Sequence, residues 1–201
     1  MIIATEDQLR EIYGYPSGRA KDKLLNSLEK HSIHFVANSP FLTISTINKA
    51  GEMDCSPRGG TPGFVKVVNE NCIVIPDAKG NNRVDSISNI VDTGNVGILF
   101  FIPGLDETLR VNGHAYISTN EEHLTLFSSE EKNIKACIVI TVEEVFLHCA
   151  KAFMRSKLWK SEAQIDRANF PSMGQMLKDQ IGSSETPETT EDMIKRYQKD
   201  L

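Results

Sequence analysis

Residues 72–104, "CIVIPDAKGNNRVDSISNIVDTGNVGILFFIPG", predict a short helix between two strands. The first run, "CIVIP", is rich in β-branched residues, and "NVGILFFIPG" is apolar throughout, as expected of a strand that is buried on both faces. Between them, residues 83–91 recover helical spacing, with Val84, Ile87 and Ile90 on one side. The first strand and the helix are joined by two asparagines and an arginine, which is more polar chemistry than a turn requires.

The segments on either side of this unit also have the patterns of strands. "FLTISTIN" is rich in β-branched and aromatic residues, and "GFVKVVNENCIVIPD" holds two strand-like runs joined by a hairpin at "NEN". "ETLRVNGHAYIST" alternates imperfectly, and residues 136–148, "ACIVITVEEVFLH", form a further long run. About six strands with few helices favour a barrel or a sandwich over a doubly wound sheet. We therefore predict an α+β fold, a β-barrel with flanking helices.

The two ends of the chain are predicted to be helical or polar. Residues 5–13, "TEDQLREIY", begin with Thr5 as an N-cap and form a helical run that Gly14 and Pro16 end. From Gly18 a second helical run continues through Leu25 and Leu28 toward Pro40. Near the other end, "SSETPETTED" is polar and "MIKRYQKDL" has the composition of a short helix. The predicted division is a helical lead-in packed on the barrel at 1–40, a barrel domain at 41–182, and a polar linker with a terminal helix at 183–201.

Composition narrows the class of protein. A chain of 201 residues with 40% hydrophobic residues can build one sizeable core, and a net charge of -5 argues against a nucleic-acid binder. The four cysteines form no CxxC pair and the five histidines form no HExxH motif, so we expect neither a metal site nor a disulfide framework. No apolar run approaches the ~20 residues of a membrane span, and the N-terminus has no apolar signal region. We expect a cytoplasmic protein with no membrane or nucleic-acid partner.

The polar junction at Asn81, Asn82 and Arg83 has two interpretations. Backbone N–H groups at a helix N-terminus, amide side chains and a guanidinium can converge there on an anion such as a phosphate. Alternatively, Gly80 and the asparagines only form a turn and a cap, and Arg83 is solvated. On chemistry alone the second interpretation is favoured, because the motif is neither GxGxxG nor a P-loop.

A second candidate lies in residues 56–67, "SPRGGTPGFVKV", where Arg58 is surrounded by glycine and proline and Lys66 follows in a strand. The glycines could let a ligand approach the backbone beside the positive charge of Arg58, or they could mark a bulged edge strand. A third candidate is "CAKAFMRSKLWK", where Lys151, Arg155 and Trp159 lie at i, i+4 and i+8 of a predicted helix. This stripe could contact an aromatic anionic ligand, or it could be a solvated face anchored by Trp159.

Three segments in the same order resemble the pyridoxamine 5'-phosphate oxidase-like FMN-binding proteins over residues 38–160: "SPRGG", "IPDAKGNNRVDSISNIVDTGNVGILFFIPG" and "ETLRVNGHAYIST". The resemblance is greatest to a bacterial subgroup of FMN-dependent flavoproteins with "GNNR", "ETLRVNG" and "KAFMRSKLW" at these positions. It implies a six-stranded split β-barrel with flanking helices. It also implies a homodimer that binds one FMN in each of two clefts at the subunit interface.

The resemblance also assigns roles to individual residues. It places Arg58 at the FMN phosphate or ribityl chain, Pro76 and Asp77 beside the isoalloxazine edge, and Asn82 with Arg83 at the phosphate. The remaining positions that it implies are Lys66 as a basic strand residue, Thr108 as a polar contact from the partner subunit, and Lys151, Arg155 and Trp159 as a basic helix over the cofactor cleft. No catalytic residue is identified by this route.

The function implied by the resemblance is an FMN-dependent oxidoreductase that acts on a small molecule. Two departures argue against a true pyridoxamine phosphate oxidase: the chain ends in "QKDL" in place of an "RLxP"-type ending, and the usual SxK phosphate pattern is replaced by NNR. The alternatives are a flavin-binding protein that senses or stores the cofactor without turnover, and a barrel that binds haem or the deazaflavin F420, because one fold hosts several functions.

Overall fold

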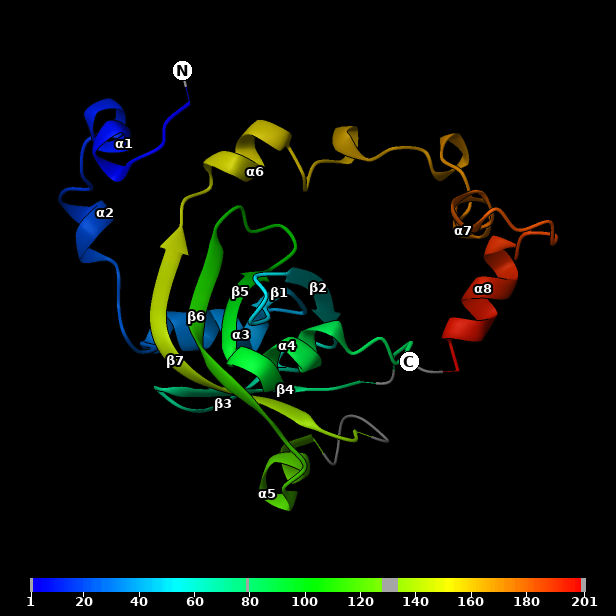
Figure 1. The fold of residues 1–201 in the computed structure, drawn as a ribbon, viewed down its shortest axis with the longest axis horizontal. Coiled ribbons are helices and arrows are strands. Elements are labelled where there is room, and N and C mark those ends of the chain that lie inside the picture. The colour runs from blue at the N-terminus through cyan, green and yellow to red at the C-terminus, as the bar shows by residue number, and fades with distance from the viewer. Residues whose placement is uncertain (1, 79, 128–133, 200–201) are drawn as a thin grey trace. The chain divides into compact units, whose positions relative to one another are not determined.

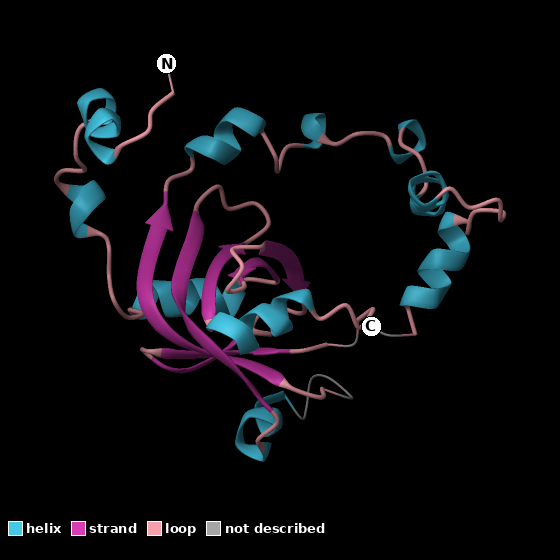
Figure 2. Cartoon of the chain, in the orientation of Figure 1, coloured by secondary structure: helices cyan, strands magenta, loops and turns pink. Residues whose placement is uncertain are grey.

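The computed structural model describes residues 2–78, 80–127 and 134–199 of the chain. It divides into two compact units, Met1–Arg155 and Ser156–Leu201 (Figure 1). The first unit contains the whole β-sheet and the helices beside it (Figure 2). The second unit contains helices and turns. The division predicted at residues 40/41 and 182/183 stays a prediction.

The first unit is built on one antiparallel sheet of seven strands. In spatial order the strands are β2 (Met53–Gly59), β1 (Phe41–Ile47), β5 (Asn95–Phe101), β6 (Thr108–Ser118), β7 (Cys137–His148), β4 (Cys72–Pro76) and β3 (Lys66–Asn69). The predicted barrel of six strands is corrected in two respects. There is a seventh strand, β2, and the edge strands β2 and β3 do not pair with each other in the described part of the chain, so the sheet is not closed. The strand pattern of β2 is masked in the sequence by Pro57, a residue that edge strands tolerate.

Successive side chains of a strand point to opposite faces of the sheet, and the face with the buried apolar side chains forms the core. In β1, Leu42 and Ile44 are fully buried while their neighbours are not, and in β5, Ile98 and Phe100 follow the same rule. The prediction that β5 is buried on both faces is therefore wrong, because its second face is only partly covered. Antiparallel sheets commonly cover one face only.

Strand β4 is buried on both faces, as is the first part of its neighbour β7. Ile73, Val74 and Ile75 have no exposed surface, because Ile73 and Ile75 belong to the main core and Val74 to a second, smaller cluster on the other side. In that second cluster Val74 packs with Phe127 and Cys137. The strand end at Pro76 is therefore held from two sides.

The N-terminal helices are shorter than the sequence predicts. Helix α1 (Glu6–Tyr13) is confirmed, with the Thr5 hydroxyl accepting from the Gln8 backbone N–H. The predicted continuous helix through Leu28 is wrong: α2 (Arg19–Asp22) ends early and Leu25 pairs with Val145 of β7 as an isolated bridge. Helix α3 (Lys30–Asn38) starts afresh, because Glu29 and Ser32 form a reciprocal capping box.

Helix α4 (Asp85–Thr93) covers the end of β1 and β2, as the sequence predicted for residues 83–91. Its buried side contains a polar residue, Asn89, whose amide donates to the Thr46 hydroxyl at 3.0 Å. The Thr93 hydroxyl donates to the Ile47 carbonyl at 2.6 Å. These two hydrogen bonds fix the rotation of α4 over the sheet.

The other helices of the first unit are α5 (Glu121–Leu124) and α6 (Lys151–Ser156). The second unit contains α7 (Met173–Ile181) and α8 (Thr190–Tyr197), with an ion pair between Glu188 and Arg196 at 2.8 Å. The predicted terminal helix is confirmed, although it begins inside the predicted linker, where the Thr189 hydroxyl caps it. None of the helices in the described ranges is long and apolar enough to cross a membrane.

Gly113 is expected to be essential for the pairing of β6 with β7. It lies where the register shifts between the two strands, and a Cβ atom there would overlap the backbone carbonyl of Thr141. Gly113→Ala should therefore lower the free energy of unfolding by about 2 kcal/mol or more, measured by urea denaturation.

Gly59→Ala is the matched control. A Cβ at Gly59 would meet the Pro40 carbonyl oxygen at 3.4 Å, an ordinary contact. This variant should stay within about 0.5 kcal/mol of the wild type. Equal losses in the two variants would contradict the close approach at Gly113.

Candidate functional site: a cavity between β2 and the start of α4

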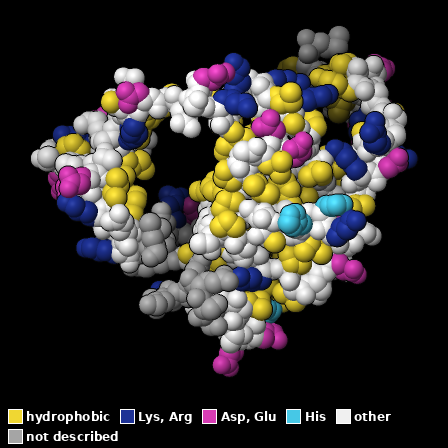
Figure 3. All heavy atoms as spheres, turned by 180° about the vertical axis from the view of Figure 1, so that it is seen from behind, with side chains coloured by type: hydrophobic (Ala, Val, Ile, Leu, Met, Phe, Trp, Pro, Cys, Tyr) yellow, Lys and Arg dark blue, Asp and Glu magenta, His cyan; other side chains and the backbone are white. Residues whose placement is uncertain are grey.

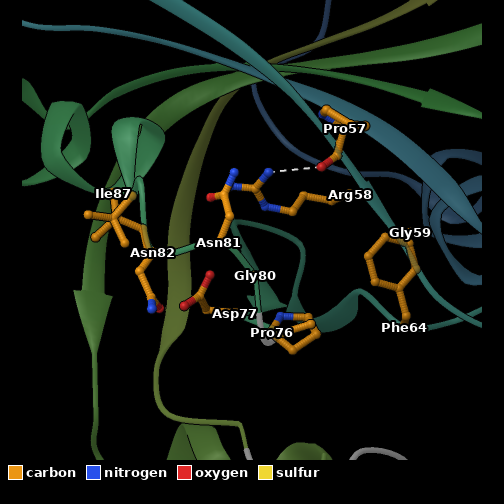
Figure 4. A pocket seen from close by; sticks show the side chains of 12 residues that line it. Pro57, Arg58, Gly59, Phe64, Pro76, Asp77, Gly80, Asn81, Asn82 and Ile87 are labelled. Atoms are coloured by element: carbon orange, nitrogen blue, oxygen red, sulfur yellow. Dashed lines mark hydrogen bonds between the residues drawn. The ribbon is translucent and has the colours of Figure 1, made fainter. Parts of the chain in front are cut away.

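The first unit contains a cavity of about 310 Å³ where the ends of β2 and β4 meet the start of α4. We call it the β2–α4 cavity. Figure 4 shows the Arg58 side chain extending from β2 toward Asn81 on the loop before α4. The residues that line the cavity are Pro57, Arg58, Gly59, Phe64, Pro76, Asp77, Ala78, Gly80, Asn81, Asn82, Val84 and Ile87.

Arg58 supplies positive charge to the cavity. Its guanidinium donates to the Pro57 carbonyl at 2.8 Å, to the Ser56 hydroxyl at 3.0 Å and to the Ser86 hydroxyl at 3.3 Å. All three acceptors are neutral oxygen atoms, so the charge of Arg58 is not cancelled by a direct ion pair in the described part of the molecule. Of the two interpretations of "SPRGG", the edge strand is confirmed, although β2 pairs with β1 without a bulge, and the approach of a ligand to Arg58 stays a prediction.

Two hydroxyls and a carboxylate that the sequence did not predict lie behind Arg58. The Ser86 hydroxyl donates to Asp54 Oδ2 at 2.5 Å and lies 2.6 Å from the Ser56 hydroxyl. Asp54, Ser56 and Arg58 alternate along β2, so all three point to one face of the strand. The pattern D-x-S-x-R was a visible signal, but the contribution of Ser86 from a helix 30 residues away was not.

The loop before α4 adopts two left-handed residues, Asn82 with φ of 61° and Val84 with φ of 52°. Asn81 accepts a hydrogen bond from the Arg83 backbone N–H at 3.1 Å. Val84 is the N-cap residue of α4 and its side chain cannot cap, so within the described residues no side chain satisfies the N–H groups of the first turn. Such a helix start favours an anion.

The structure separates the two residues that were predicted to bind a phosphate together. Asn82 lines the cavity. Arg83 donates instead to the Asp85 carboxylate at 2.7 Å, and its side chain is 74% exposed. Their predicted role at a phosphate stays a prediction.

Pro76 and Asp77 form the strand end at the cavity, where they were predicted to lie. The Asp77 backbone N–H donates to the Ala136 carbonyl at 2.9 Å, which continues the pairing of β4 with the chain before β7. Burial raises the pKa of the Asp77 carboxyl above its ordinary value, and the positive charges of Arg58 and Lys135 oppose the shift. Asp77 is thus an acid whose charged form is disfavoured beside the cavity.

The other predicted residues do not line this cavity. The Lys66 ammonium lies over the Phe127 ring, 5.7 Å from its centroid, and Thr108 is buried at the start of β6 opposite His148. The predicted helical stripe of Lys151, Arg155 and Trp159 is wrong as a stripe: α6 ends at Ser156, and Lys157 turns the backbone into the left-handed region with φ of 53°. Trp159 belongs to the second unit.

The sequence and the fold of this chain are similar to those of known proteins. The family model described as pyridoxamine 5'-phosphate oxidase matches residues 28–149, a span that includes every strand of the sheet and the whole β2–α4 cavity. The chain belongs to the pyridoxamine 5'-phosphate oxidase family. The resemblance stated from the sequence is confirmed at this level, and the antiparallel sheet with flanking helices is the fold of this family member. The search of curated proteins found no match.

Solved structures are similar to this chain at low sequence identity, and HupZ, at a TM-score of 0.50, shows the same fold. HupZ from Group A Streptococcus is 18% identical with a TM-score of 0.50, covering 60% of this chain and 93% of that one. A putative pyridoxamine 5'-phosphate oxidase from Lactobacillus delbrueckii is 16% identical with a TM-score of 0.49, covering 61% and 95%. An FMN-binding protein from Syntrophomonas wolfei is 13% identical with a TM-score of 0.45, covering 57% and 81%. At these identities the likeness concerns the fold alone.

The raised pKa of Asp77 predicts a stability effect that depends on pH. Because the fold disfavours the charged carboxylate, Asp77→Asn should raise the free energy of unfolding at pH 7, by no more than about 1 kcal/mol since solvent screens a half-exposed group. The difference from the wild type should shrink as the pH falls through the pKa of Asp77, where the wild-type carboxyl becomes neutral. Urea denaturation at pH 7 and at mildly acidic pH measures it.

Asp92→Asn is the control with the opposite sign. Hydrogen bonds from Lys49 lower the pKa of Asp92, so its charged form is favoured by the fold. This variant should be less stable than the wild type at pH 7. A destabilised Asp77→Asn protein at pH 7 would show that the Asp77 carboxylate is stabilised by the fold after all.

Proposed function

We propose that this member of the pyridoxamine 5'-phosphate oxidase family binds FMN, with the phosphate in the β2–α4 cavity, and uses it as an oxidoreductase on a small molecule. The observation that supports this most is the convergence of the Arg58 guanidinium and the uncapped start of α4 on one cavity. A cation and free N–H groups are the donors that a phosphate ester requires.

The residues present fit an FMN phosphate. Arg58 would donate charged N–H groups to it, the amides of Asn81 and Asn82 would add neutral donors, and Asn82 holds the left-handed backbone that turns the loop around the cavity. Pro76 and Asp77 would stand at the isoalloxazine edge, as the family resemblance implies. When bound, the flavin supplies the hydride and electron chemistry, and the protein supplies binding and orientation.

We also propose that the protein is a cytoplasmic homodimer in which Thr108 and residues of the partner contribute to each flavin site. The second face of the sheet supports a dimer, because it carries partly exposed aromatic side chains beside polar ones such as Arg110 and Glu144. Phe41 is 40% exposed and stacks at 5.7 Å on Phe101, which lies 6.0 Å from Phe153. Hydrophobic side chains also gather in the middle of the face seen in Figure 3. Exposed apolar patches commonly mark interfaces.

The cofactor proposal is tested by reconstitution and spectroscopy. The purified protein should be yellow or should become so with FMN, and its absorption spectrum distinguishes flavin from haem and from deazaflavin. Arg58→Ala should weaken FMN about tenfold or more while riboflavin, which has no phosphate, is affected far less, since a charge-assisted hydrogen bond contributes ~1.5–3 kcal/mol. Titration calorimetry measures both ligands.

Arg83→Ala and Arg10→Ala complete the comparison. Arg83→Ala loses FMN affinity only if this side chain contacts the phosphate, and Arg10, which pairs with Glu6 on α1, is a control remote in sequence. A protein that takes up no FMN would refute the cofactor proposal. Bound FMN that no nicotinamide donor reduces faster than free FMN would favour a non-catalytic flavin-binding protein.

The dimer proposal predicts a mass in solution of twice that of the chain by sedimentation. Phe41→Glu, which places a charge on the exposed sheet face, should give a monomer with weakened FMN binding. Val91→Glu is the control, because Val91 is 74% exposed on α4 and lies outside the sheet. A monomeric wild type that binds FMN fully would contradict the shared site.

A further inference from the structure

Four side chains from β2 and α4 form a continuous hydrogen-bonded cluster next to the β2–α4 cavity. Asp54 Oδ2 accepts from Ser86 at 2.5 Å and from Ser56 at 3.2 Å, and both hydroxyls accept from Arg58. Ser86 is only 3% exposed, so the cluster is closed to solvent on the helix side. Only Arg58 lines the cavity; the other three lie behind it.

The direction of each hydrogen bond follows from the groups involved. A guanidinium can only donate and an ionised carboxylate can only accept, so the two hydroxyls between them must accept from Arg58 and donate toward Asp54. The Ser86 proton points at Asp54 Oδ2, and the Ser56 proton points at Ser86 or Asp54. Both hydroxyls therefore present lone pairs to Arg58.

We propose that Asp54 is a positioning residue for the phosphate site: through the hydroxyls of Ser86 and Ser56 it orients the guanidinium of Arg58 toward a phosphate ester in the β2–α4 cavity. This inference rests on the proposed function. Asp54 forms no direct ion pair with Arg58 among the described residues. The two hydroxyls and the Pro57 carbonyl accept three of the five guanidinium N–H groups, which leaves the Nε–H and one Nη2–H for a phosphate. A direct carboxylate partner would compete with the ligand.

The sign of a substitution distinguishes positioning from plain electrostatics. A carboxylate close to an anion site repels the anion, so if Asp54 acts only by its charge, Asp54→Asn strengthens phosphate binding. If Asp54 acts through the hydroxyls, the same change weakens it, because the amide N–H₂ group can turn a serine hydroxyl and remove a lone pair from Arg58. The two effects have opposite signs in one measurement.

The experiment compares FMN with riboflavin on the full-length protein by titration calorimetry. Asp54→Asn should raise the Kd for FMN about fivefold or more and leave the Kd for riboflavin within about twofold, because only FMN offers a phosphate to Arg58. Asp92→Asn, a carboxylate at the other end of α4 that pairs with Lys49, is the matched control and should change neither.

A double-mutant cycle separates positioning from loosening of α4. In an Arg58→Ala background, Asp54→Asn should have almost no further effect on FMN, because its path of action has been removed. If the substitution only disturbs the packing of α4 on β2, the loss of FMN affinity persists in that background and the inference is overturned. Unchanged or tighter FMN binding in the single variant overturns it as well, while the proposed function stands.

If the wild type binds no FMN, the proposed function is refuted. The role of Asp54 can then still be measured without flavin. In the flavin-free protein, ¹⁵N NMR of Arg58 should show slow guanidinium rotation, because its two terminal nitrogens donate to different hydroxyls. Asp54→Asn and Ser86→Ala should both speed up this rotation. An unchanged Arg58 signal in both variants means that Asp54 does not position the guanidinium.

Discussion

The placement of α4 across the end of β1 and β2 is the constraint on which the site depends. The Asn89 amide bonded to Thr46 sets its rotation, and Ser86 bonded to Asp54 sets the approach of its first turn to β2. If α4 were rotated by one residue, Ser86 would leave Arg58 and the loop containing Asn82 would move away from β2. The cavity is therefore a product of helix docking rather than of the loop alone.

The docking surface of α4 is partly polar: of its three buried residues, Ser86 and Asn89 are polar and Ile90 belongs to the hydrophobic core. A buried hydroxyl or amide without a partner costs about 1–3 kcal/mol, whereas a paired one is close to neutral. Because Asn89, Thr46 and Ser86 all have partners, the layer between α4 and the sheet tolerates its polarity and gains directionality. Across an apolar layer α4 could shift or rotate slightly over the sheet, whereas hydrogen bonds require fixed donor–acceptor distances and so hold it in one position.

The sequence predicts the strands well where alternation is strong and fails where turn residues interrupt it. The edge strand β2 contains Pro57 and is followed by Gly60, so its period of two was not recognised, and the count of strands came out at six instead of seven. The lead-in was predicted as helix because Leu25 and Leu28 have helical spacing, but tertiary pairing of Leu25 with β7 overrides that local preference.

The candidate site too could be predicted from the sequence only where local patterns mark its residues. Arg58, Asp77 and Asn82 were found because local composition and the resemblance pointed to them, and they do line one cavity. Ser86 was invisible because it meets Ser56 only after α4 docks. The hydrogen bond from Arg83 to Asp85 could not be predicted either, because sequence spacing does not show which of several acceptors an exposed arginine binds.

Charge around the β2–α4 cavity points to what kind of phosphate ligand it suits. Two carboxylates, Asp54 behind Arg58 and Asp77 in the cavity lining, balance the positive charges of Arg58 and Lys135, so a single chain offers no excess of positive charge to a free phosphate dianion. A ligand held there must bring binding energy from elsewhere, from a large flat body against Phe64 and Pro76 or from contacts with a second subunit. The proposed flavin mononucleotide at a proposed shared interface would meet that requirement, because its ring system would supply the apolar contact area and its phosphate would need only to be oriented.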